Sequence, residues 1–181
     1  HSISDLYKTL NLSFEDEMDF TILSIPEIHH QIPFKSPILR ADYFSFILTI
    51  NGLGVYYLDD TKFPFDSRTI YFTNPGHTKS YELNESKEAY LITLTENFLR
   101  EYVHPEIYDE FPFLLAEIVP PKTLSEKKIK EYETLYKHIL DEFEKSSIYK
   151  KKILGNLFVV LLLKIKEDFW LDYNPIMEGN K

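Results

Sequence analysis

The chain has 181 residues, and its 29 Asp and Glu against 20 Lys and Arg give a formal net charge of −9. This acidic balance opposes sequence-independent attraction to a phosphate backbone, so we do not expect the chain to bind DNA by itself. It has no cysteine, which excludes a disulfide framework and a thiolate metal site and is compatible with the reducing cytoplasm that we expect as its location.

The first half of the chain predicts short β-strands separated by turns. The strands expected before the first glycine turn lie at 19–25, 32–34 and 43–50. The Asn51-Gly52 pair has turn chemistry, so residues 55–58 are expected to pair back before a second turn at Asp59-Asp60. This pattern indicates a hairpin meander.

Further strands and a short helix follow. The strands are expected at 69–73, 81–83 and 89–94. The Asn74-Pro75-Gly76 turn closes the first of them, and their spacing is typical of an all-β barrel or sandwich. Thr95 comes next, and its hydroxyl can cap a short helix that ends before Pro105.

After Pro120-Pro121 the hydrophobic period changes from about two to about 3.6 residues, which indicates helices. The segment from Thr123 to Glu126 fits a capping box, in which both side chains satisfy free backbone donors. Behind it, the apolar residues fall on one helical face, as expected for a helix with one packed side. These residues are Ile129, Tyr132, Leu135, Tyr136, Ile139 and Phe143.

The last helix, expected at about 149–169, is apolar over most of its circumference, since Val159, Val160 and Leu163 lie outside its main apolar stripe. Such a helix must be buried on two sides, and one barrel face supplies only one of them. We therefore expect the preceding helix and a second copy of the chain to cover the rest. The residues predicted to form this homodimer seam are Leu154, Leu157, Phe158, Leu161, Leu162 and Ile165.

These patterns divide the chain into a barrel with an N-terminal arm at 1–118, a helical dimerisation subdomain at 123–172 and the start of a linker at 173–181. The last part is polar and contains Pro175 and Gly179, as linkers do. We expect a DNA-binding domain beyond it. The longest apolar run, 157–163, is far shorter than the ~20 residues of a membrane span, so no membrane association is expected.

Four groups of residues between 38 and 100 stand in an informative order. They are Tyr43-Phe44-x6-Asn51-Gly52-x-Gly54, the Leu58-Asp59 turn, the Phe72-x-x-Pro75-Gly76 strand end and Leu94-Thr95-x-x-Phe98-Leu99. With the two helices that follow, they resemble the N-terminal effector-binding and dimerisation half of AraC-type bacterial transcription regulators. The resemblance implies a mainly β fold with a C-terminal α part: a cupin-like β-barrel (double-stranded β-helix or jelly roll) followed by an antiparallel helix pair.

The resemblance also bears on metal binding. Cupin enzymes carry two histidines and a glutamate before the first glycine turn and a third histidine after the Pro-Gly turn, a ligand set suited to divalent transition metals. Counting from Gly52 and from Pro75-Gly76 gives the four corresponding positions here. They are occupied by Ile38, Arg40, Ser45 and Lys79. Because Arg and Lys bring only donors and positive charge, we expect no metal and no cofactor in the barrel.

The same correspondence points Arg40, Ser45 and Lys79 into the barrel lumen, and strand alternation adds Tyr43, Ile47 and Tyr81. Two cations facing aromatic walls suit an anionic or polyhydroxylated small molecule. Tyr81 also falls where the arabinose-sensing member of the family places a sugar-contacting tyrosine. The residues predicted to bind the effector are Arg40, Tyr43, Ser45, Lys79 and Tyr81.

Other interpretations of these residues stay open. Arg40 and Lys79 would instead lie at the barrel mouth in solvent, or pair with Asp42 or Glu82, if the strand register differs by one residue. The histidines at 29, 30 and 77 are interpreted as loop or surface residues, because no convergent carboxylate pattern accompanies them.

Together these features predict a ligand-sensing and dimerisation domain of an AraC-type regulator. Its effector would shift a conformational equilibrium, and DNA would be contacted only through a helix-turn-helix domain absent from this chain. A cupin-type metal-dependent dioxygenase or isomerase is the alternative. A purely dimerising scaffold with a filled barrel is a third possibility.

Overall fold

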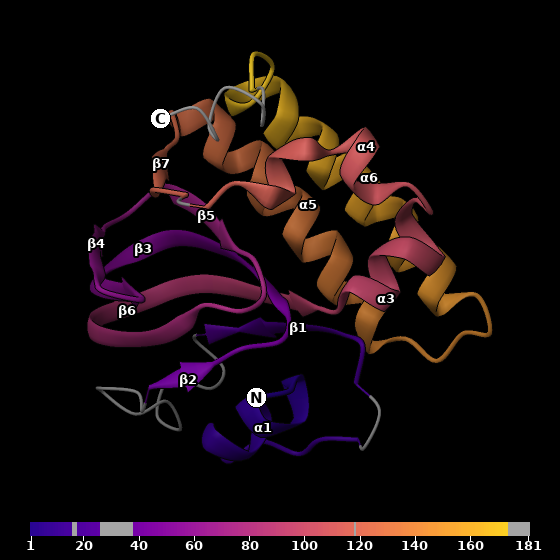
Figure 1. The fold of residues 1–181 in the computed structure, drawn as a ribbon, viewed down its shortest axis with the longest axis horizontal. Helices are drawn as coiled ribbons and strands as arrows, with labels where there is room; N and C mark the ends of the chain where they lie inside the picture. Colours follow the sequence, from indigo (N-terminus) through magenta and orange to yellow (C-terminus); the bar gives the residue numbers. More distant parts are fainter. Residues whose placement is uncertain (16–17, 26–37, 118, 174–181) are drawn as a thin grey trace.

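A computed structural model describes residues 1–15, 18–25, 38–117 and 119–173 (Figure 1). Its strands are β1 (Phe20–Ser24), β2 (Leu39–Arg40), β3 (Phe44–Leu58), β4 (Thr61–Phe65), β5 (Thr69–Thr73), β6 (Thr78–Leu94) and β7 (Lys122–Thr123). Its helices are α1 (Ile3–Thr9), α3 (Glu96–Phe98), the π-helical η2 (Leu99–Val103), α4 (Ile107–Glu110), the 3-10 helix η3 (Pro112–Leu115), α5 (Glu126–Glu144) and α6 (Lys150–Phe169). The described strands form one antiparallel sheet, so the predicted mainly β, cupin-like fold with a C-terminal helix pair is confirmed. The strand expected at 32–34 lies outside the described residues.

Two long strands, β3 and β6, organise the sheet. The strand order is β1-β6-β3-β5-β7, with β2 on β6 and β4 on β3. Strand β3 runs through Asn51 and Gly52 without reversing, so the hairpin expected there is wrong. Register shifts against β6 between Thr49 and Gly54 absorb the irregularity as β-bulges, which bend a strand instead of ending it. The chain first reverses at Asp59, whose φ of 51° suits the tight turn between β3 and β4.

Strand β6 likewise unites the segments 81–83 and 89–94, which the sequence predicts as separate strands. Gly54 lies inside β3, so it is not part of a turn. A Cβ at this position would collide with the Phe65 ring of β4 and with the Glu82 carbonyl group of β6. Gly54 therefore permits a close approach between neighbouring strands.

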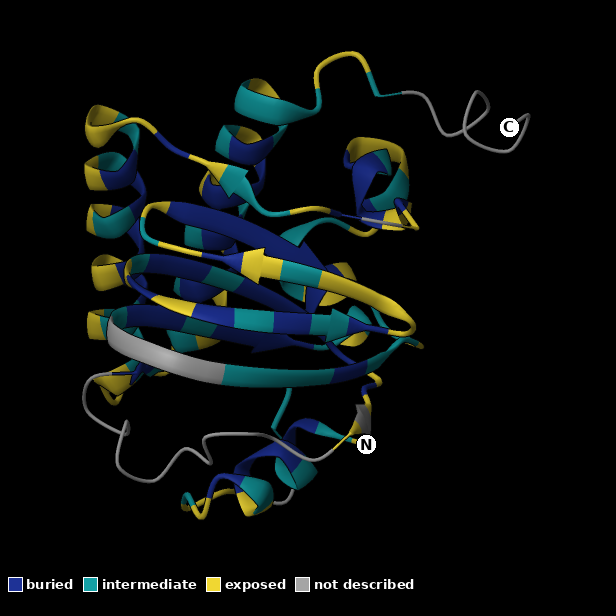
Figure 2. Cartoon of the chain, turned by 90° about the vertical axis from the view of Figure 1, so that its left-hand side faces the viewer, coloured by how far each residue is buried: buried dark blue, intermediate teal, exposed yellow. Residues whose placement is uncertain are grey.

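The sheet curls back on itself. Tyr56 lies in the second half of β3, whereas Tyr71 of β5 pairs with Ile47 in the first half. The rings of Tyr56 and Tyr71 nevertheless pack with their centroids 5.3 Å apart. Figure 2 shows buried residues running along the curled strands, while β4 is mostly exposed. This curvature gives the barrel-like shape.

Helices α5 and α6 cover one face of the sheet, which we call the outer face (Figure 1). Even-numbered residues at the start of β3 point to this face, and the Phe46 ring meets the Phe158 ring of α6 at 5.0 Å. Sheet and helices thus share one hydrophobic core. Residues of the sheet in this core include Phe20, Ile22, Phe44, Phe46, Leu48, Ile70, Phe72, Tyr90, Ile92 and Leu94. Whether 1–118 and 123–172 are separable domains remains a prediction.

The apolar stripe of α6 lies in this core, so the prediction that it forms a homodimer seam is wrong. Leu154, Phe158, Leu161, Leu162 and Ile165 are at most 3 % exposed, and Leu157 packs against the same cluster. The chain itself covers α6 on several sides, since η2 also packs on it: a Cβ at Gly155 would collide with the Tyr102 backbone. The exposed large apolar residues of α6 are Val160 and Leu163.

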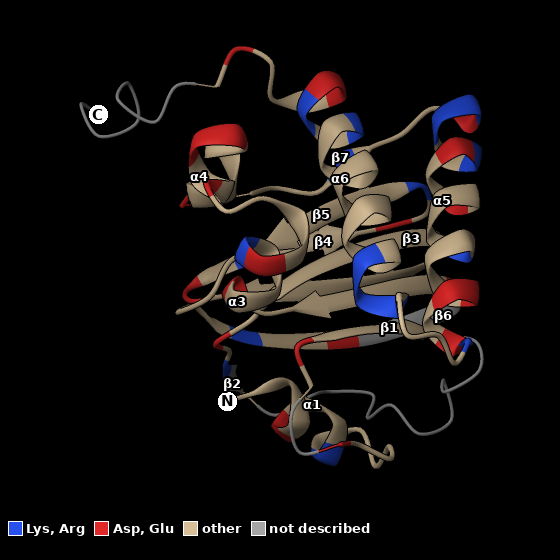
Figure 3. Ribbon diagram, turned by 90° about the vertical axis from the view of Figure 1, so that its right-hand side faces the viewer, with Lys and Arg blue, Asp and Glu red and all other residues tan. Residues whose placement is uncertain are grey.

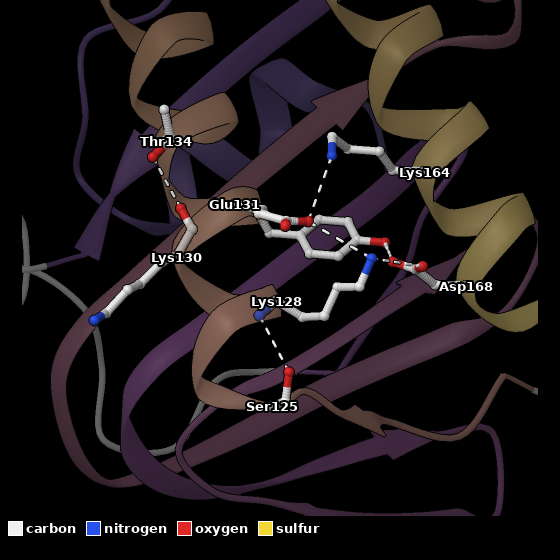
Figure 4. Close-up of polar contacts among 8 residues, drawn as sticks. Ser125, Lys128, Lys130, Glu131, Thr134, Lys164 and Asp168 are labelled. Carbon is white, nitrogen blue, oxygen red and sulfur yellow. Dashed lines mark hydrogen bonds and ion pairs between the residues drawn. The ribbon is translucent and has the colours of Figure 1, made fainter.

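A polar cluster joins α5 to α6 (Figure 4). The Tyr132 hydroxyl donates to Asp168 Oδ2 at 2.8 Å, and Lys128 Nζ lies 3.1 Å from Asp168 Oδ1. Glu131 pairs with both Lys128 and Lys164, at 3.6 and 3.8 Å. These contacts fix the register of the two helices where α5 begins and α6 ends.

The helix caps agree with the predictions in one case and differ in another. Thr95 accepts a hydrogen bond from the Phe98 N–H group at 3.2 Å, as predicted. Helix α5, however, begins after Ser125, which caps it by accepting from the Lys128 N–H group. Thr123 pairs in β7 instead, so the capping box is wrong. Charged residues follow one another along α5, as expected for a helix with one wet side (Figure 3).

Candidate functional site

The face of the sheet opposite α5 and α6, which we call the inner face, is far more polar than the outer one. Along β3, Phe44 and Phe46 belong to the helix-covered core, whereas Ser45 and Ile47 point the other way. Side chains of successive residues in a strand lie on opposite faces, so the same alternation holds in β1, β5 and β6. The inner face is the part of the fold where polar side chains are buried together.

A row of four hydroxyl groups crosses the inner face in register. Thr21 of β1 pairs with Thr93 of β6, Thr93 with Ser45 of β3, and Ser45 with Thr73 of β5. All four are at most 6 % exposed. Thr21 and Thr93 hydrogen-bond each other, whereas the Thr73 hydroxyl faces Tyr56 and has no other partner among the described residues. We call this set the hydroxyl row; one of its members is a buried polar atom that a ligand would satisfy.

Lys79 lies on the inner face near one end of β6. It pairs with Leu58 of β3, whose side chain belongs to the inner cluster with Tyr56 and Tyr71. Only 8 % of Lys79 is exposed. Its Nζ donates to the Tyr43 carbonyl oxygen at 3.3 Å and lies 5.0 Å from the centre of the Tyr43 ring. Burial lowers the pKa of Lys79 to about 7, and the negative charge of Asp42 opposes this only in part.

Four tyrosines surround this region. Tyr43 is 3 % exposed, and Tyr56 and Tyr71 are about as deeply buried. Tyr81, which pairs with Tyr56, contacts both the Tyr43 cluster and the Tyr56 cluster. Burial raises the pKa of all four phenols, that of Tyr81 to about 12, so they stay protonated and can donate hydrogen bonds. The Tyr56 hydroxyl faces the Thr73 hydroxyl, and neither makes another hydrogen bond to the described residues.

Arg40 is not in this region, so the expectation that it points into the lumen is wrong. In β2, Leu39 pairs with Lys79 and Arg40 with Thr78. Directly paired residues share a face, so a register one residue away from the expected one turns Arg40 outward. Its side chain is exposed, and Nε donates to the Gly76 carbonyl oxygen at 3.1 Å. Of the predicted effector-binding residues, the structure therefore brings together Tyr43, Ser45, Lys79 and Tyr81.

Helix α1 packs on the inner face, across the sheet from α5 and α6 (Figure 1). Ile3, Leu6, Tyr7 and Leu10 form a buried cluster with Tyr43. The inner-face residues Leu23, Tyr81 and Leu91 pack against this cluster. The Tyr7 hydroxyl also faces the Thr21 side chain of the hydroxyl row. The N-terminal helix thus covers the part of the inner face next to Lys79.

The four positions that correspond to cupin metal ligands do not form a donor set. Ile38 and Arg40 are exposed, whereas Ser45 and Lys79 face inward. Within the described ranges, no three His, Asp, Glu or Cys side chains come together as a metal site would need. His77 pairs instead with Asp59, Nδ1 to Oδ2 at 2.7 Å, at the barrel rim. His29 and His30 lie outside the described residues.

Sequence reasoning missed three inner-face residues, Tyr56, Tyr71 and Thr73. Tyr56 was missed because the expected turn at Asn51-Gly52 separated it from the first half of β3. Tyr71 and Thr73 carried a usable signal, since the alternation from Thr69 to Thr73 places them on the same face as Ser45.

A separate groove of about 750 Å³ is lined in part by residues of β1. Its lining includes residues from both faces of that strand, such as Ile22 and Leu23, and residues of both C-terminal helices, such as Phe143 and Leu154. Lys151 and Asp19, which also line the groove, form an ion pair at 2.9 Å. The groove is distinct from the region around Lys79, which does not line it.

No protein-family model matches the sequence, and a search of curated proteins finds no significant match. Among solved structures, the chain is similar to the AraC-like transcriptional activator CuxR, with 10 % identity and a TM-score of 0.46 over 67 % of this chain and 42 % of that one. It is similar to ToxT from Vibrio cholerae, with 10 % identity and a TM-score of 0.46 over 87 % and 61 % of the two chains. A cupin domain of Cnp3 from Schizosaccharomyces pombe gives 16 % identity and a TM-score of 0.36 over 49 % and 65 %.

In each of these pairs the chain spans less than two thirds of the matched protein. AraC-like regulators, the family that the sequence motifs resemble, are thus among the structures that share features of this fold, together with cupin domains. At these identities the similarity concerns the fold.

Proposed function

We propose that this chain is the effector-sensing part of an AraC-type transcription regulator in the cytoplasm, and that it binds a small anionic or polyhydroxylated molecule on the inner face. The observation that supports this most directly is the buried hydroxyl row beside Lys79, on the face opposite the helix-packed core. A face that only stabilised the fold would be expected to be apolar, because burying polar groups with unfilled hydrogen-bonding capacity is costly. The sequence motifs from Tyr43 to Leu99 supply the link to this class of regulator.

The hydrogen-bonding capacity left on the inner face matches such a ligand. Lys79 has three N–H donors and one backbone acceptor at 3.3 Å. The hydroxyls of Tyr56 and Thr73 face each other and make no further hydrogen bond within the described part of the chain. A ligand with several oxygen acceptors would satisfy these groups, while the rings of Tyr43 and Tyr71 would contact its carbon skeleton.

Helix α1 provides a route from ligand binding to a change of shape. It contacts Tyr43, whose ring lies against Lys79, and it contacts the hydroxyl row through Tyr7. A ligand that binds better to one position of α1 than to another shifts the population between them by its differential affinity. In the regulator, this shift would be relayed to DNA-binding domains that are not part of this chain.

The proposal includes a homodimer, with a seam that differs from the one predicted from sequence. On the side of α6 turned away from the core, Val160 and Leu163 are 42 % and 47 % exposed. A single Leu163→Glu change would put a charge in an apolar seam and should convert a dimer into a monomer, measured by light scattering after size exclusion. Thr134→Glu on the exposed side of α5 is the control. A monomeric wild type at high concentration would contradict this part of the proposal.

Ligand screening by thermal shift tests the function. A ligand that binds the folded state raises the melting temperature by linkage. A hit on the inner face should lose most of this increase in Thr73→Val, which removes one hydroxyl of the row, and keep it in Thr134→Val on exposed α5. Metal analysis of protein purified without chelators separates the proposal from the enzyme alternative, because a stoichiometric transition metal would contradict effector binding in this form.

A further inference from the structure

Lys79 combines deep burial with the absence of an ion-paired carboxylate among the described residues. Its contacts are the Tyr43 carbonyl oxygen and the Tyr43 ring, and no carboxylate of a described residue forms an ion pair with Nζ. Asp42 acts on it only from a greater distance. Since desolvation penalises the ammonium form, the neutral amine is favoured, and burial indeed lowers the pKa of Lys79 to about 7. A neutral lysine amine in an aromatic setting is a nucleophile.

We infer that Lys79 captures a small carbonyl compound, an aldehyde or ketone, as a reversible imine on the inner face. The inference rests on the proposed function, since it specifies how this face would hold its effector. Of the two ligand classes in the proposed function, the inference specifies the polyhydroxylated one, because a neutral carbonyl compound does not need the ammonium form that burial disfavours. A hydroxylated aldehyde would in addition find partners in the hydroxyl row.

The chemistry needs no further reactant. The Nζ lone pair forms a bond to the carbonyl carbon, the π electrons of the C=O bond move to oxygen, and that oxygen takes up the proton that the nitrogen releases. Loss of water from this carbinolamine gives the C=N bond, so amine and carbonyl compound become imine and water. No oxidant or reductant is consumed, and hydrolysis reverses the step.

Tyr56 is positioned to assist. It pairs with Tyr81, two residues along β6 from Lys79 and on the same face, so its side chain is a diagonal neighbour of Lys79. Its buried hydroxyl has no partner other than Thr73 among the described residues, and burial raises its pKa, so it remains a donor. It would donate to the carbonyl oxygen and then pass its proton to the departing water while it takes up the proton that the nitrogen releases, so the phenol is restored. Thr73, which faces Tyr56, would accept from the phenol in the free protein after a small rotation.

Reductive trapping tests the inference. The chain is incubated at pH 7 with acetaldehyde or benzaldehyde and sodium cyanoborohydride, which reduces the imine to a stable secondary amine, and the modified lysines are mapped by peptide mass spectrometry. An ordinary lysine holds roughly one free amine in a few thousand at this pH, against about half for Lys79. We expect Lys79 to be labelled at least about tenfold faster than the exposed Lys127 and Lys130, because this excess outweighs restricted access.

The matched variants are Lys79→Met and Lys79→Arg, which both remove the amine while one keeps the charge, and Tyr56→Phe, which should slow labelling of Lys79 without changing that of Lys130. Circular dichroism checks that each is folded. Labelling of Lys79 no faster than of Lys130 in the wild type overturns the imine. If other ligands still raise the melting temperature through the inner face, effector binding stands without it; if none does, the proposed function fails as well.

Discussion

The burial of Lys79 predicts an unusual dependence of stability on pH. We consider Lys79→Met, which keeps a long flexible side chain and removes the charge. In the folded chain the pKa of Lys79 is about 7, against 10.5 for an exposed lysine. Below pH 7 both folded and unfolded states hold the proton, and the folded state carries the full cost of the buried charge. Between pH 7 and 10.5 only the unfolded state holds it, so wild-type stability rises with pH.

The magnitude follows from this difference in pKa. Each tenfold change in proton affinity corresponds to about 1.4 kcal/mol, so the buried ammonium costs about 5 kcal/mol at pH 6 as an upper bound. Lys79→Met should therefore raise the free energy of unfolding most at pH 6. At pH 9 this gain in the free energy of unfolding should be about 2 to 3 kcal/mol smaller, because Lys79 of the folded wild type is neutral at that pH.

Urea unfolding of both proteins at pH 6, 7.5 and 9 measures this difference directly. Lys130→Met on exposed α5 is the control and should change stability little at any pH. Comparing the wild type with Lys79→Met isolates Lys79, because the contributions of all other titrating groups to the pH dependence cancel. Parallel pH profiles of wild type and Lys79→Met would refute the reasoning, since they would mean that Lys79 stays charged and hydrated in the folded state.

Four further substitutions test the helix packing, one turn and the polar cluster between α5 and α6. Gly155→Ala should destabilise the chain by about 1 to 3 kcal/mol in urea unfolding despite the better helix propensity of alanine, because its Cβ would overlap the Tyr102 backbone. Gly76→Ala should cost about 1 to 2 kcal/mol in the same assay, since φ is 94° there while no side chain stands in the way; an unchanged midpoint would mean that the turn relaxes. Asp168→Asn should lower the melting temperature by weakening the charge-assisted hydrogen bond from Tyr132, worth about 1 kcal/mol, and Tyr132→Phe should cost less in that background than in the wild type.

The sequence predicted the kinds of elements better than their connections. The alternation from Tyr43 onward and the 3.6-residue period after Pro121 gave the sheet and the helix pair correctly, because hydrophobic periodicity reflects burial on one face. The Asn51-Gly52 pair misled because local turn chemistry is indistinguishable from a β-bulge without knowing that β6 pairs along the whole of β3. That pairing is a long-range contact, which no local pattern contains.

The candidate site was predictable to the extent that counting along a strand is reliable. Ser45, Lys79, Tyr43 and Tyr81 lie on the inner face because they share strands with residues whose alternation is clear. The prediction that Arg40 points inward was wrong because β2 is two residues long, and so short a strand has no periodicity that would indicate a face. The prediction of a homodimer seam on α6 was wrong for another reason. The amphipathic pattern identifies a buried face correctly, but it does not indicate whether the covering surface belongs to the same chain.

The opposite chemistry of the two sheet faces would let the proposed ligand sensing coexist with helix packing in so small a barrel. On the outer face, rings such as Phe46 and Phe158 interlock at 5.0 Å, and such packing leaves little freedom for rearrangement. On the inner face, α1 is held mainly by the small cluster around Tyr43, so displacing it would expose less apolar surface than displacing α6. A ligand beside Lys79 would therefore move α1 before it disturbed the helix pair. Substitutions that loosen α1, such as Leu6→Ala, should raise ligand affinity if α1 competes with the ligand and lower it if α1 closes over it.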